Sequence, residues 1–314
     1  AVVTGANSGL GLEASRELAR KGATVILGVR NVTKGQAALD AIKAEIPGAE
    51  LEVRRLDLAS LASVREFAEG VTREHPAIDI LLNNAGIMAT PPRETSDGFE
   101  SQVGTNHLGH FALTAALMPA LERAPAARIV TMTSVARFGG DPLTTARTYL
   151  TAGYGAWASY GHSKLANYQF GIELARRLTA AGSSVSSLVA HPGLSRTGLQ
   201  GTAVRAGSAG VVGRVADAVT RWIGMDPAAG TLPQLRAATD PNARNGEFYG
   251  PRWTAFGAPV MAKAANDPSI GTKAATMWQV SEDAIGASFE ASSGDRIERA
   301  GIASGPRPVG ASRD

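Results

Sequence analysis

The sequence contains no cysteine among its 314 residues. This absence excludes disulfide bonds and every metal or redox site that is built on thiolates. The chain also lacks an apolar run close to the roughly 20 residues of a membrane-spanning helix, and no signal-peptide pattern opens it. We therefore expect a cytoplasmic protein without stable membrane insertion. The opening Ala-Val-Val-Thr resembles the middle of a strand, so we expect the natural start to lie a few residues earlier.

A strong imbalance of charge is missing as well. The 31 Lys and Arg residues face 28 Asp and Glu residues, which gives a net charge of +3, and the isoelectric point is about 9.3. Nucleic-acid binding needs basic residues gathered on one surface, whereas here acidic residues are interleaved with them. No nucleic-acid partner is therefore expected. The 44% of hydrophobic residues is enough for one large core.

Short apolar runs alternate with longer amphipathic segments over the first two-thirds of the chain, which is the pattern of a parallel sheet covered by helices. After the opening run, the predicted strands are 24–28, 51–56, 78–82, 128–133 and 184–189, and the predicted helices are 9–20, 33–46, 61–73, 98–122 and 157–181. The predicted fold class is α/β, a Rossmann-type doubly wound parallel sheet. Such a sheet binds its ligand at the carboxyl ends of the strands, beside the topological switch point.

No internal repeat and no linker-like break divides the chain, so residues 1–291 are predicted to form a single domain. The alternation fades after Gly193, and only a strand signal at 248–249 and a last helix over 273–285 follow. Residues 292–314 are rich in Gly, Ser, Pro and Arg, and we expect them to form a mobile C-terminal tail.

Residues 194–228 carry an apolar face at helical spacing with two arginines opposite. The apolar face consists of Val211, Val212, Val215, Val219, Trp222 and Ile223, and the arginines are Arg214 and Arg221. Three interpretations are open: a substrate lid over an apolar ligand, a core-facing helix, or a helix on a membrane surface. We favour the lid, because two arginines are few for attachment to a membrane.

A glycine-rich loop follows the first strand and opens the first helix. Thr4–Gly11 reads TGANSGLG, and its glycines at 5, 9 and 11 permit a tight turn and a close approach of the backbone to a pyrophosphate. The helix start adds free N–H groups and the positive end of the helix dipole. The spacing differs from the general G-x-G-x-x-G fingerprint, and the alternative is an ordinary strand-to-helix turn.

The end of the second strand bears on the choice of cofactor. An acidic residue there binds the ribose 2′-hydroxyl of NAD, but this chain has Gly28-Val29-Arg30-Asn31. A guanidinium suits a 2′-phosphate instead. We therefore predict NADP, with NAD as the less favoured cofactor; the alternative is that Arg30 is a solvated surface residue.

Tyr160 and Lys164 lie four positions apart at the start of a predicted helix, so both side chains point to the same side of it. A neighbouring cation favours the phenolate and lowers the pKa of a tyrosine. The pair can then act as general acid in a reduction and as general base in an oxidation. This motif is weak alone, because most copies are surface pairs. The motif gains weight from further polar, glycine or proline residues, which lie at predicted strand ends or on the flanking helix: Asp57, Asn84, Gly86, Asn106, Thr133, Ser134, Pro192 and Gly193.

Together these residues resemble the short-chain dehydrogenase/reductase family over about residues 1–255. Within that family the chain is most similar to the retinol dehydrogenase and WW-domain oxidoreductase group. The resemblance is carried by Thr4–Gly11, Arg30-Asn31, the stretch 97–111 (DGFESQVGTNHLGHF) and the stretch 160–167 (YGHSKLAN).

The resemblance implies a set of site residues. It makes Tyr160 the proton donor and acceptor, lets Ser134 hold the substrate oxygen, and has Lys164 lower the tyrosine pKa and bind the nicotinamide ribose. Asn106 is implied to anchor a water-linked proton relay. The implied cofactor-binding residues are Gly5, Asn7, Ser8, Gly9, Leu10, Gly11, Arg30, Asn31, Asp57, Leu58, Asn84, Ala85, Gly86, Tyr160, Lys164, Pro192, Gly193 and Thr197.

Two features depart from the simplest family members. Ser134 and Tyr160 are 26 positions apart, and the intervening segment 137–157 is interpreted as an insertion. This insertion could cover the helix face through which other members dimerise, so a homo-oligomer is possible but not required. His162 occupies a variable position of the motif, and we interpret it as a cleft-side or solvent-facing residue.

Two of the histidines are considered as metal ligands. His107 and His110 have ligand-compatible spacing, but no third ligand is evident, so we interpret them as packing and hydrogen-bonding residues and expect no metal. His191 precedes Pro192 and is given no chemical role.

The predicted function is that of an NADP-preferring oxidoreductase, which transfers a hydride between the nicotinamide and a small apolar carbonyl or alcohol. Reduction of an activated C=C bond is a second hypothesis, and a catalytically idle NADP-binding sensor or scaffold is a third. The presence of both Tyr160 and Lys164 speaks against the third.

Overall fold

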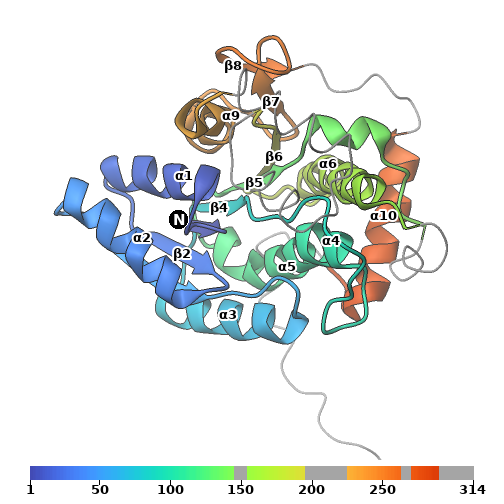
Figure 1. Ribbon diagram of the computed structural model, residues 1–314, viewed down its shortest axis with the longest axis horizontal. Coiled ribbons are helices and arrows are strands. Elements are labelled where there is room, and N and C mark those ends of the chain that lie inside the picture. The colour runs from blue at the N-terminus through green and yellow to red at the C-terminus, as the bar shows by residue number, and fades with distance from the viewer. Residues whose placement is uncertain (145–153, 195–224, 263–269, 290–314) are drawn as a thin grey trace, which may run out of the picture.

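The computed structural model describes residues 1–144, 154–194, 225–262 and 270–289 (Figure 1). An eight-stranded sheet has the order β3-β2-β1-β4-β5-β6-β7-β8. All neighbouring strands are parallel except β7 and β8, which pair antiparallel. The predicted doubly wound α/β fold is confirmed.

The strands are short and the helices connect them. The strands are β1 (Val2–Thr4), β2 (Val25–Val29), β3 (Leu51–Arg55), β4 (Ile80–Asn83), β5 (Arg128–Met132), β6 (Ser186–Ala190), β7 (Phe248–Pro251) and β8 (Pro259–Ala262). The helical elements are α1 (Gly9–Arg20), α2 (Val32–Glu45), α3 (Leu61–Glu74), α4 (Ser101–Val103), η1 (Gly104–Leu108), α5 (Gly109–Glu122), η2 (Val135–Gly139), α6 (Ala156–Ala180), α9 (Pro227–Thr239) and α10 (Ile270–Ile285).

The sheet lies between two layers of helices, and the alternation of side chains along each strand supplies both cores. Val2 and Leu81 point to the layer formed by α3, α5, α6 and α10. Their chain neighbours Val3 and Leu82 point to the layer formed by α1, α2 and α9. Because both faces are covered, the central strands are mainly apolar on both faces, and their few polar residues stand mostly at the strand ends.

The strand order reverses between β1 and β4. The loops that follow these two strands therefore diverge to opposite faces and leave a crevice at the carboxyl edge of the sheet. The glycine-rich loop after β1 and Asn84–Gly86 after β4 meet at this point.

The segment predicted as one helix over 98–122 consists of three pieces. Glu100 caps α4, because its carboxylate accepts from the main-chain N–H groups of Gln102 and Val103 at 2.9 and 2.8 Å. The chain then passes through a π-helical turn, η1, before it continues as α5. Such a turn holds one residue more than an α-helical turn and is frequent at functional sites; here it contains Asn106.

Helix α9 and strand β8 were not predicted from the sequence, so the predicted set of elements was incomplete. Pro227, Gly230 and Pro233 obscure the helical pattern of α9. Asp226 caps the helix and Pro227 stands in its first turn, where a missing N–H costs nothing. The predicted lid 194–228 thus runs into the first residues of α9, and its residues 195–224 lie outside the described residues, as does the predicted tail.

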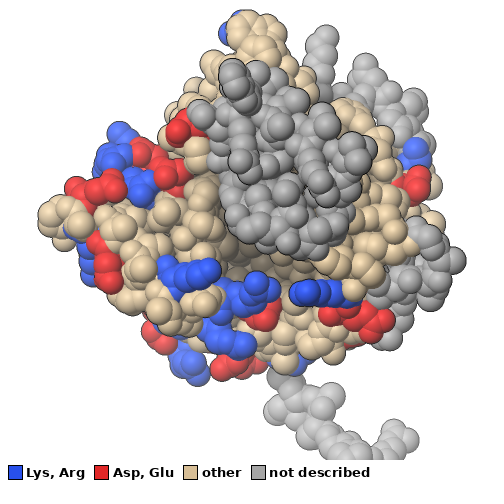
Figure 2. Space-filling model, viewed as in Figure 1, with Lys and Arg blue, Asp and Glu red and all other residues tan. Residues whose placement is uncertain are grey.

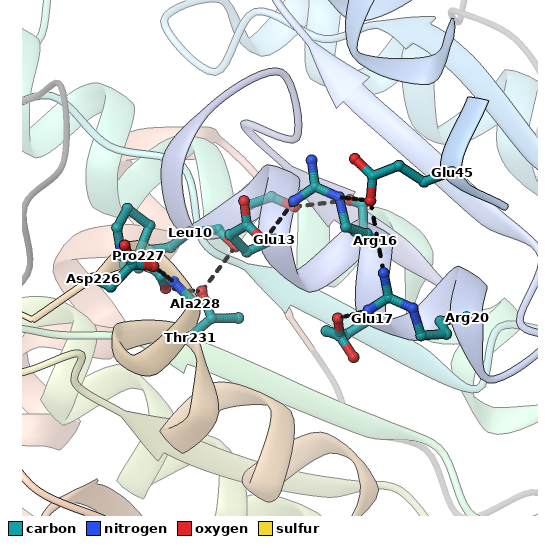
Figure 3. A network of polar contacts seen from close by, with 12 residues as sticks. Leu10, Glu13, Arg16, Glu17, Arg20, Glu45, Asp226, Pro227, Ala228 and Thr231 are labelled. Carbon is teal, nitrogen blue, oxygen red and sulfur yellow. Dashed lines mark hydrogen bonds and ion pairs between the residues drawn. The ribbon is translucent and has the colours of Figure 1, made fainter. Parts of the chain in front are cut away.

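Helix α9 packs against α1 at the glycine-rich loop (Figure 3). The buried Gln234 amide donates to the main-chain carbonyl of Leu10 at 3.3 Å, and the buried Thr231 hydroxyl, which donates to the Pro227 carbonyl at 2.8 Å, lies 3.4 Å from the Leu10 carbonyl. On the other side of α1, Arg16 pairs with Glu13 at 2.5 Å and with Glu45 of α2 at 3.2 Å. The start of α1 is therefore held from α9, and its body is tied to α2.

Helix α10 covers the outer face of α5 and α6, and Figure 1 shows α6 and α10 side by side. Trp278 of α10 meets Phe111 of α5 edge to face with ring centroids 4.9 Å apart, and Phe170 of α6 at 5.9 Å.

No helix in the described part of the chain combines the length and the apolar character needed to cross a bilayer. On the face shown in Figure 2, lysine and arginine side chains stand beside aspartate and glutamate side chains. The described part of this face thus has no continuous surface of one sign.

Candidate active site

The glycine-rich loop borders a cavity of about 550 Å³ at the switch point. Residues at the ends of the four strands β1 to β4, with Lys34 and Thr105 from neighbouring helical elements, line it: Gly5, Asn7, Ser8, Gly9, Leu10, Gly28, Arg30, Lys34, Leu56, Asp57, Leu58, Asn84, Ala85, Gly86, Ile87, Met88, Thr90 and Thr105. Of the residues predicted to bind cofactor, eleven belong to this lining. Gly11 lies behind it, where a Cβ atom would come within 2.6 Å of the Asn84 Nδ2. The loop can therefore pack against β4 only with glycine at this position.

Thr4 joins the two loops of the crevice. Its hydroxyl oxygen accepts from the main-chain N–H groups of Asn84 and Ala85, both at 2.9 Å. The Asn84 amide in turn donates to the main-chain carbonyl of Thr4 at 2.9 Å. These bonds fix the glycine-rich loop relative to β4 without using the N–H groups at the start of α1.

Two cations stand at the other end of the cavity. Arg30 and Lys34 are both exposed and both line it, together with Asp57 and Leu58. Lys34 was missed in the sequence analysis, although its place one turn into α2 puts it close to the end of β2. Asn31 does not line the cavity; its side chain caps α2 by accepting from the Lys34 N–H at 2.9 Å.

Tyr160 and Ser134 meet near the end of β5. Tyr160 is buried near the start of α6, and Ser134 stands at the N-cap of η2. Burial raises the pKa of Tyr160 to about 12, and a hydrogen bond with Ser134 opposes this rise. The phenol is therefore neutral at physiological pH and holds a proton that it can donate.

Lys164 lies one turn further along α6 and is also buried. Its Nζ is 5.8 Å from the centroid of the Tyr160 ring and donates to the main-chain carbonyl of Met132 at 3.3 Å. Burial lowers the pKa of Lys164 to about 8. The ammonium thus stays charged at pH 7 but carries a large cost of desolvation.

Asn106 connects the π-helical turn to both sides of the site. Its Oδ1 accepts from the Ile87 N–H at 2.7 Å, and its Nδ2 donates to the Ile87 carbonyl and the Ser163 hydroxyl, both at 2.9 Å. Gly86 lies so close that a Cβ there would come within 3.2 Å of the Asn106 Oδ1 and 3.5 Å of the Lys164 Nζ. The inner end of the cavity therefore adjoins Lys164 and Asn106.

Pro192 and Gly193 follow β6, as predicted from the sequence. Gly193 has a φ of +67°, and a Cβ there would come within 2.8 Å of the Pro251 ring of β7. This position therefore requires glycine for conformation and for space. Thr197, the remaining predicted cofactor residue, lies outside the described residues.

Apolar side chains surround the Tyr160 ring. Met88 and Ala89 pack against it, with Ala136, Ala156 and Trp157 at the edge of the cluster. The Trp157 and Tyr160 rings meet edge to face with centroids 6.3 Å apart. A ligand that reaches the phenol hydroxyl from this side meets hydrocarbon.

The histidines are held by hydrogen bonds. His107 Nε2 pairs with the Ser281 hydroxyl at 2.8 Å, and His110 pairs with the Thr4 hydroxyl and the Asn106 carbonyl, both at 2.9 Å. Within the described residues, no group of three potential ligands could hold a metal ion. The solvent-facing interpretation of His162 was wrong: the residue is buried, and its Nδ1 accepts from the Asp141 N–H at 2.7 Å.

Arg137 is a second feature that the sequence analysis missed. It is buried beside Ser134, and its guanidinium lies over the rings of Phe138, Tyr168 and Phe248 at 4.3, 5.0 and 4.9 Å from their centroids. Burial lowers the pKa of this guanidinium. Nothing in the local sequence pattern distinguishes this arginine from one in solvent.

The similarity of this chain to known proteins agrees with this geometry. The family described as short chain dehydrogenase matches residues 1–206. The chain belongs to this family of oxidoreductases. Retinol dehydrogenase 12 of Mus musculus is 44% identical over 197 residues, and retinol dehydrogenase 13 of Homo sapiens is 44% identical over 198 residues. These alignments cover 62% and 63% of this chain, and the chain spans only about 60% of the length of these relatives. The predicted likeness to the retinol dehydrogenase group is confirmed.

Solved structures agree with the family. A crystal structure of an uncharacterized protein from Mycobacterium paratuberculosis is 42% identical, with a TM-score of 0.74, over 92% of this chain and 93% of that one. A short chain dehydrogenase from Shigella flexneri, solved in complex with NADP, is 25% identical with a TM-score of 0.61, over 79% of this chain and 95% of that one.

Proposed function

We propose that this chain is an NADP-preferring oxidoreductase, which transfers a hydride between the nicotinamide ring and an apolar carbonyl or alcohol. The observation that carries the proposal is the hydrogen-bonded pair of the buried Tyr160 and the half-buried Ser134, near the point where the inner end of the switch-point cavity adjoins Lys164. When bound, the nicotinamide supplies or accepts the hydride at its C4 atom. The chain's own residues bind the cofactor, orient the substrate oxygen and move the proton.

The cavity fits a dinucleotide. Its glycine-rich wall brings the backbone of Gly5 and Gly9 to the surface at the start of α1, where free N–H groups favour a pyrophosphate. A Cβ at Gly5 would come within 3.0 Å of Ala85, so the narrowness of the crevice also depends on glycine. Asp57 and Leu58 would meet the adenine, and Asn84–Gly86 would follow the rest of the cofactor.

The preference for NADP rests on charge. Arg30 and Lys34 line the same end of the cavity, and β2 ends without the acidic residue that would bind a 2′-hydroxyl. A 2′-phosphate gains charge-assisted hydrogen bonds from such cations. The NADP complex of the Shigella flexneri relative supports this choice by similarity.

Tyr160 would act as general acid in the reduction. Because its pKa is about 12, the hydroxyl is protonated at pH 7 and can donate to the carbonyl oxygen as hydride arrives at carbon. Ser134, already bonded to the phenol, would donate to the same oxygen and stabilise the charge that develops there. In the oxidation the proton returns from the alcohol to Tyr160.

Lys164 would stabilise the anionic form of Tyr160 through its charge and hold the nicotinamide ribose through its ammonium hydrogens. Asn106 would anchor the proton relay, with its amide fixing Ile87 and Ser163 beside the lysine. Met88, Ala136 and Trp157 would receive an apolar substrate, in keeping with the retinol dehydrogenases among the relatives.

Direct titration with NADPH and with NADH, followed by nicotinamide fluorescence and thermal shift, tests the cofactor assignment. We expect NADPH to bind more tightly, and Arg30→Asp and Lys34→Glu to reduce that selectivity. Lys43→Glu changes an exposed charge on the same helix outside the cavity and is the matched control. An unchanged ratio of NADPH to NADH affinity in both cavity variants would mean that Arg30 and Lys34 do not bind the 2′-phosphate. Equal affinity of the wild type for both cofactors would refute the preference itself.

A further inference from the structure

The main-chain carbonyl of Met132, at the end of β5, has two side-chain donors. Lys164 Nζ donates to it at 3.3 Å and Asn167 Nδ2 at 3.0 Å. Both donors come from α6, three positions apart, and both residues are buried. The lysine bond is longer than the roughly 2.7–2.9 Å of a strong charge-assisted hydrogen bond. Lys164 therefore shares an acceptor that Asn167 binds at the shorter distance.

The orientation of the Asn167 amide is determined by its partners. A carbonyl only accepts, so the nitrogen of the amide must face Met132. Its Oδ1 and the Nδ1 of His107 are both buried, and neither has a hydrogen-bond partner in the described part of the chain. Burial lowers the pKa of His107 to about 3, and the contact with Asn167 opposes this effect. The Asn167 side chain thus lies near enough to the His107 imidazole to favour its protonated form.

His107 extends the arrangement to α10. Its Nε2 pairs with the Ser281 hydroxyl at 2.8 Å, and both residues are fully buried. The buried side chain of Asn167 therefore lies between η1, which also carries Asn106, and the end of β5, to which its amide donates. It has little freedom to turn away from the Met132 carbonyl.

We propose that Asn167 is a positioning residue for Lys164: it keeps the Met132 carbonyl bonded so that the lysine can leave it for the cofactor. This inference rests on the proposed function. The contact of Lys164 with Met132 is long at 3.3 Å, so it is the bond that lengthens or is given up when the ammonium turns toward the nicotinamide ribose. With Asn167 present, the buried carbonyl keeps one donor after the exchange. Without it, cofactor binding leaves that carbonyl with neither of these two side-chain donors.

The size of the effect follows from the cost of an unsatisfied buried polar group, about 1–3 kcal/mol, which corresponds to a roughly 5- to 150-fold change in an equilibrium constant. We expect Asn167→Leu to weaken NADPH binding within this range. Asn167→Ala is the second variant, for the case that the leucine variant does not fold. The variants are compared by fluorescence titration with NADPH, and thermal unfolding shows that each is folded.

A double-mutant cycle separates positioning from a merely structural role. In a Lys164→Met background there is no lysine to move away from the Met132 carbonyl when NADPH binds. Asn167→Leu should therefore not change the NADPH dissociation constant in this background. Asn245→Ala is the matched control, since Asn245 also bonds a buried main-chain segment, at Ser187 and Ala175, far along the chain from the site. It should lower stability without altering NADPH affinity. Equal effects of Asn167→Leu in both backgrounds would overturn the proposal.

A second readout does not depend on cofactor binding. The pKa of Lys164 in the free protein can be measured from the pH dependence of trace acetylation, with the labelled peptide quantified by mass spectrometry. The titratable neighbours of Lys164 are Tyr160 on α6 and His110 on α5, both neutral at pH 7. In Asn167→Leu the Met132 carbonyl no longer accepts from the Asn167 amide, so it can bond the Lys164 ammonium more strongly. Because this bond stabilises the charged form, the pKa of Lys164 should rise. If the wild type binds no NADPH, the proposed function fails, and an unchanged lysine pKa would separately refute the role of Asn167.

Discussion

Gly86 and Asn106 approach each other so closely that a single added carbon atom would press on the amide: a Cβ at Gly86 would lie 3.2 Å from the Asn106 Oδ1. This contact joins the loop after β4 to the π-helical turn, and Asn106 also fixes the neighbouring Ile87 main chain. These contacts fix the inner end of the cavity relative to the side chains that we propose to be catalytic.

Gly86→Ala should disturb the contact with Asn106 and leave the fold intact. The added methyl group forces the Asn106 amide or the Lys164 ammonium to shift, and we expect NADPH to bind about tenfold more weakly, which corresponds to about 1.4 kcal/mol. Fluorescence titration measures the change. Gly48→Ala, where an added Cβ meets nothing within 4 Å, should leave the affinity unaltered. Wild-type affinity in Gly86→Ala would mean that this contact does not shape the cofactor site.

Trp278 is expected to contribute strongly to stability. It is 1% exposed and packs between Phe111 and Phe289, each at a centroid distance of 4.9 Å. Trp278→Ala should lower the free energy of unfolding by about 3–5 kcal/mol, as measured by urea denaturation. Trp253→Ala removes a tryptophan that is 63% exposed and should cost less than about 0.5 kcal/mol. Similar losses in the two variants would show that α10 does not form part of the core.

Lys164→Met should stabilise the protein while it impairs the site. The buried ammonium is charged at pH 7, so its removal should raise the free energy of unfolding by about 1–3 kcal/mol. The folded pKa of about 8 lies below the ordinary value of 10.5, so the unfolded chain binds more protons between these values and wild-type stability rises with pH there. The advantage of the variant should therefore shrink above pH 8. A constant difference from pH 6 to 9.5 would contradict the lowered pKa, and Lys21→Met, at an exposed lysine, should show no such trend.

The same ionisation should appear in cofactor binding. A charged Lys164 favours the anionic dinucleotide, so NADPH affinity should fall as pH rises through about 8 in the wild type. In Lys164→Met this decline should be absent. Titrations across this range at constant ionic strength measure it, and an identical pH dependence in both proteins would assign the ionisation to another group.

The sequence predicted the parts of the fold that local patterns encode. The helix over 9–20 was predicted with its observed bounds, because a glycine loop starts it and an amphipathic pattern fills it. Tyr160 and Lys164 were expected on one side of a helix, and one turn of α6 separates them as expected. Periodicity and strand-end residues were sufficient for both results.

What depends on distant contacts could not be predicted in this way. Gln234 and Leu10 are far apart in sequence, yet their hydrogen bond places α9 against the glycine-rich loop. Asn31 was expected at the cofactor, but its side chain is used to cap α2. The π-helical turn around Asn106 differs from an α-helix by one residue, and no hydrophobic period records so small a change.

The most direct test of the account is the turnover of Tyr160→Phe with NADPH and an apolar aldehyde that the wild type reduces. The substitution removes only the proton-donating hydroxyl, so the rate should fall by at least about 10²-fold while NADPH affinity stays close to that of the wild type. Tyr249→Phe, which removes a hydroxyl bonded to Glu247 at 2.6 Å on β7, should keep its activity. Turnover near the wild-type rate in Tyr160→Phe would contradict the account, because the proton would then come from another group.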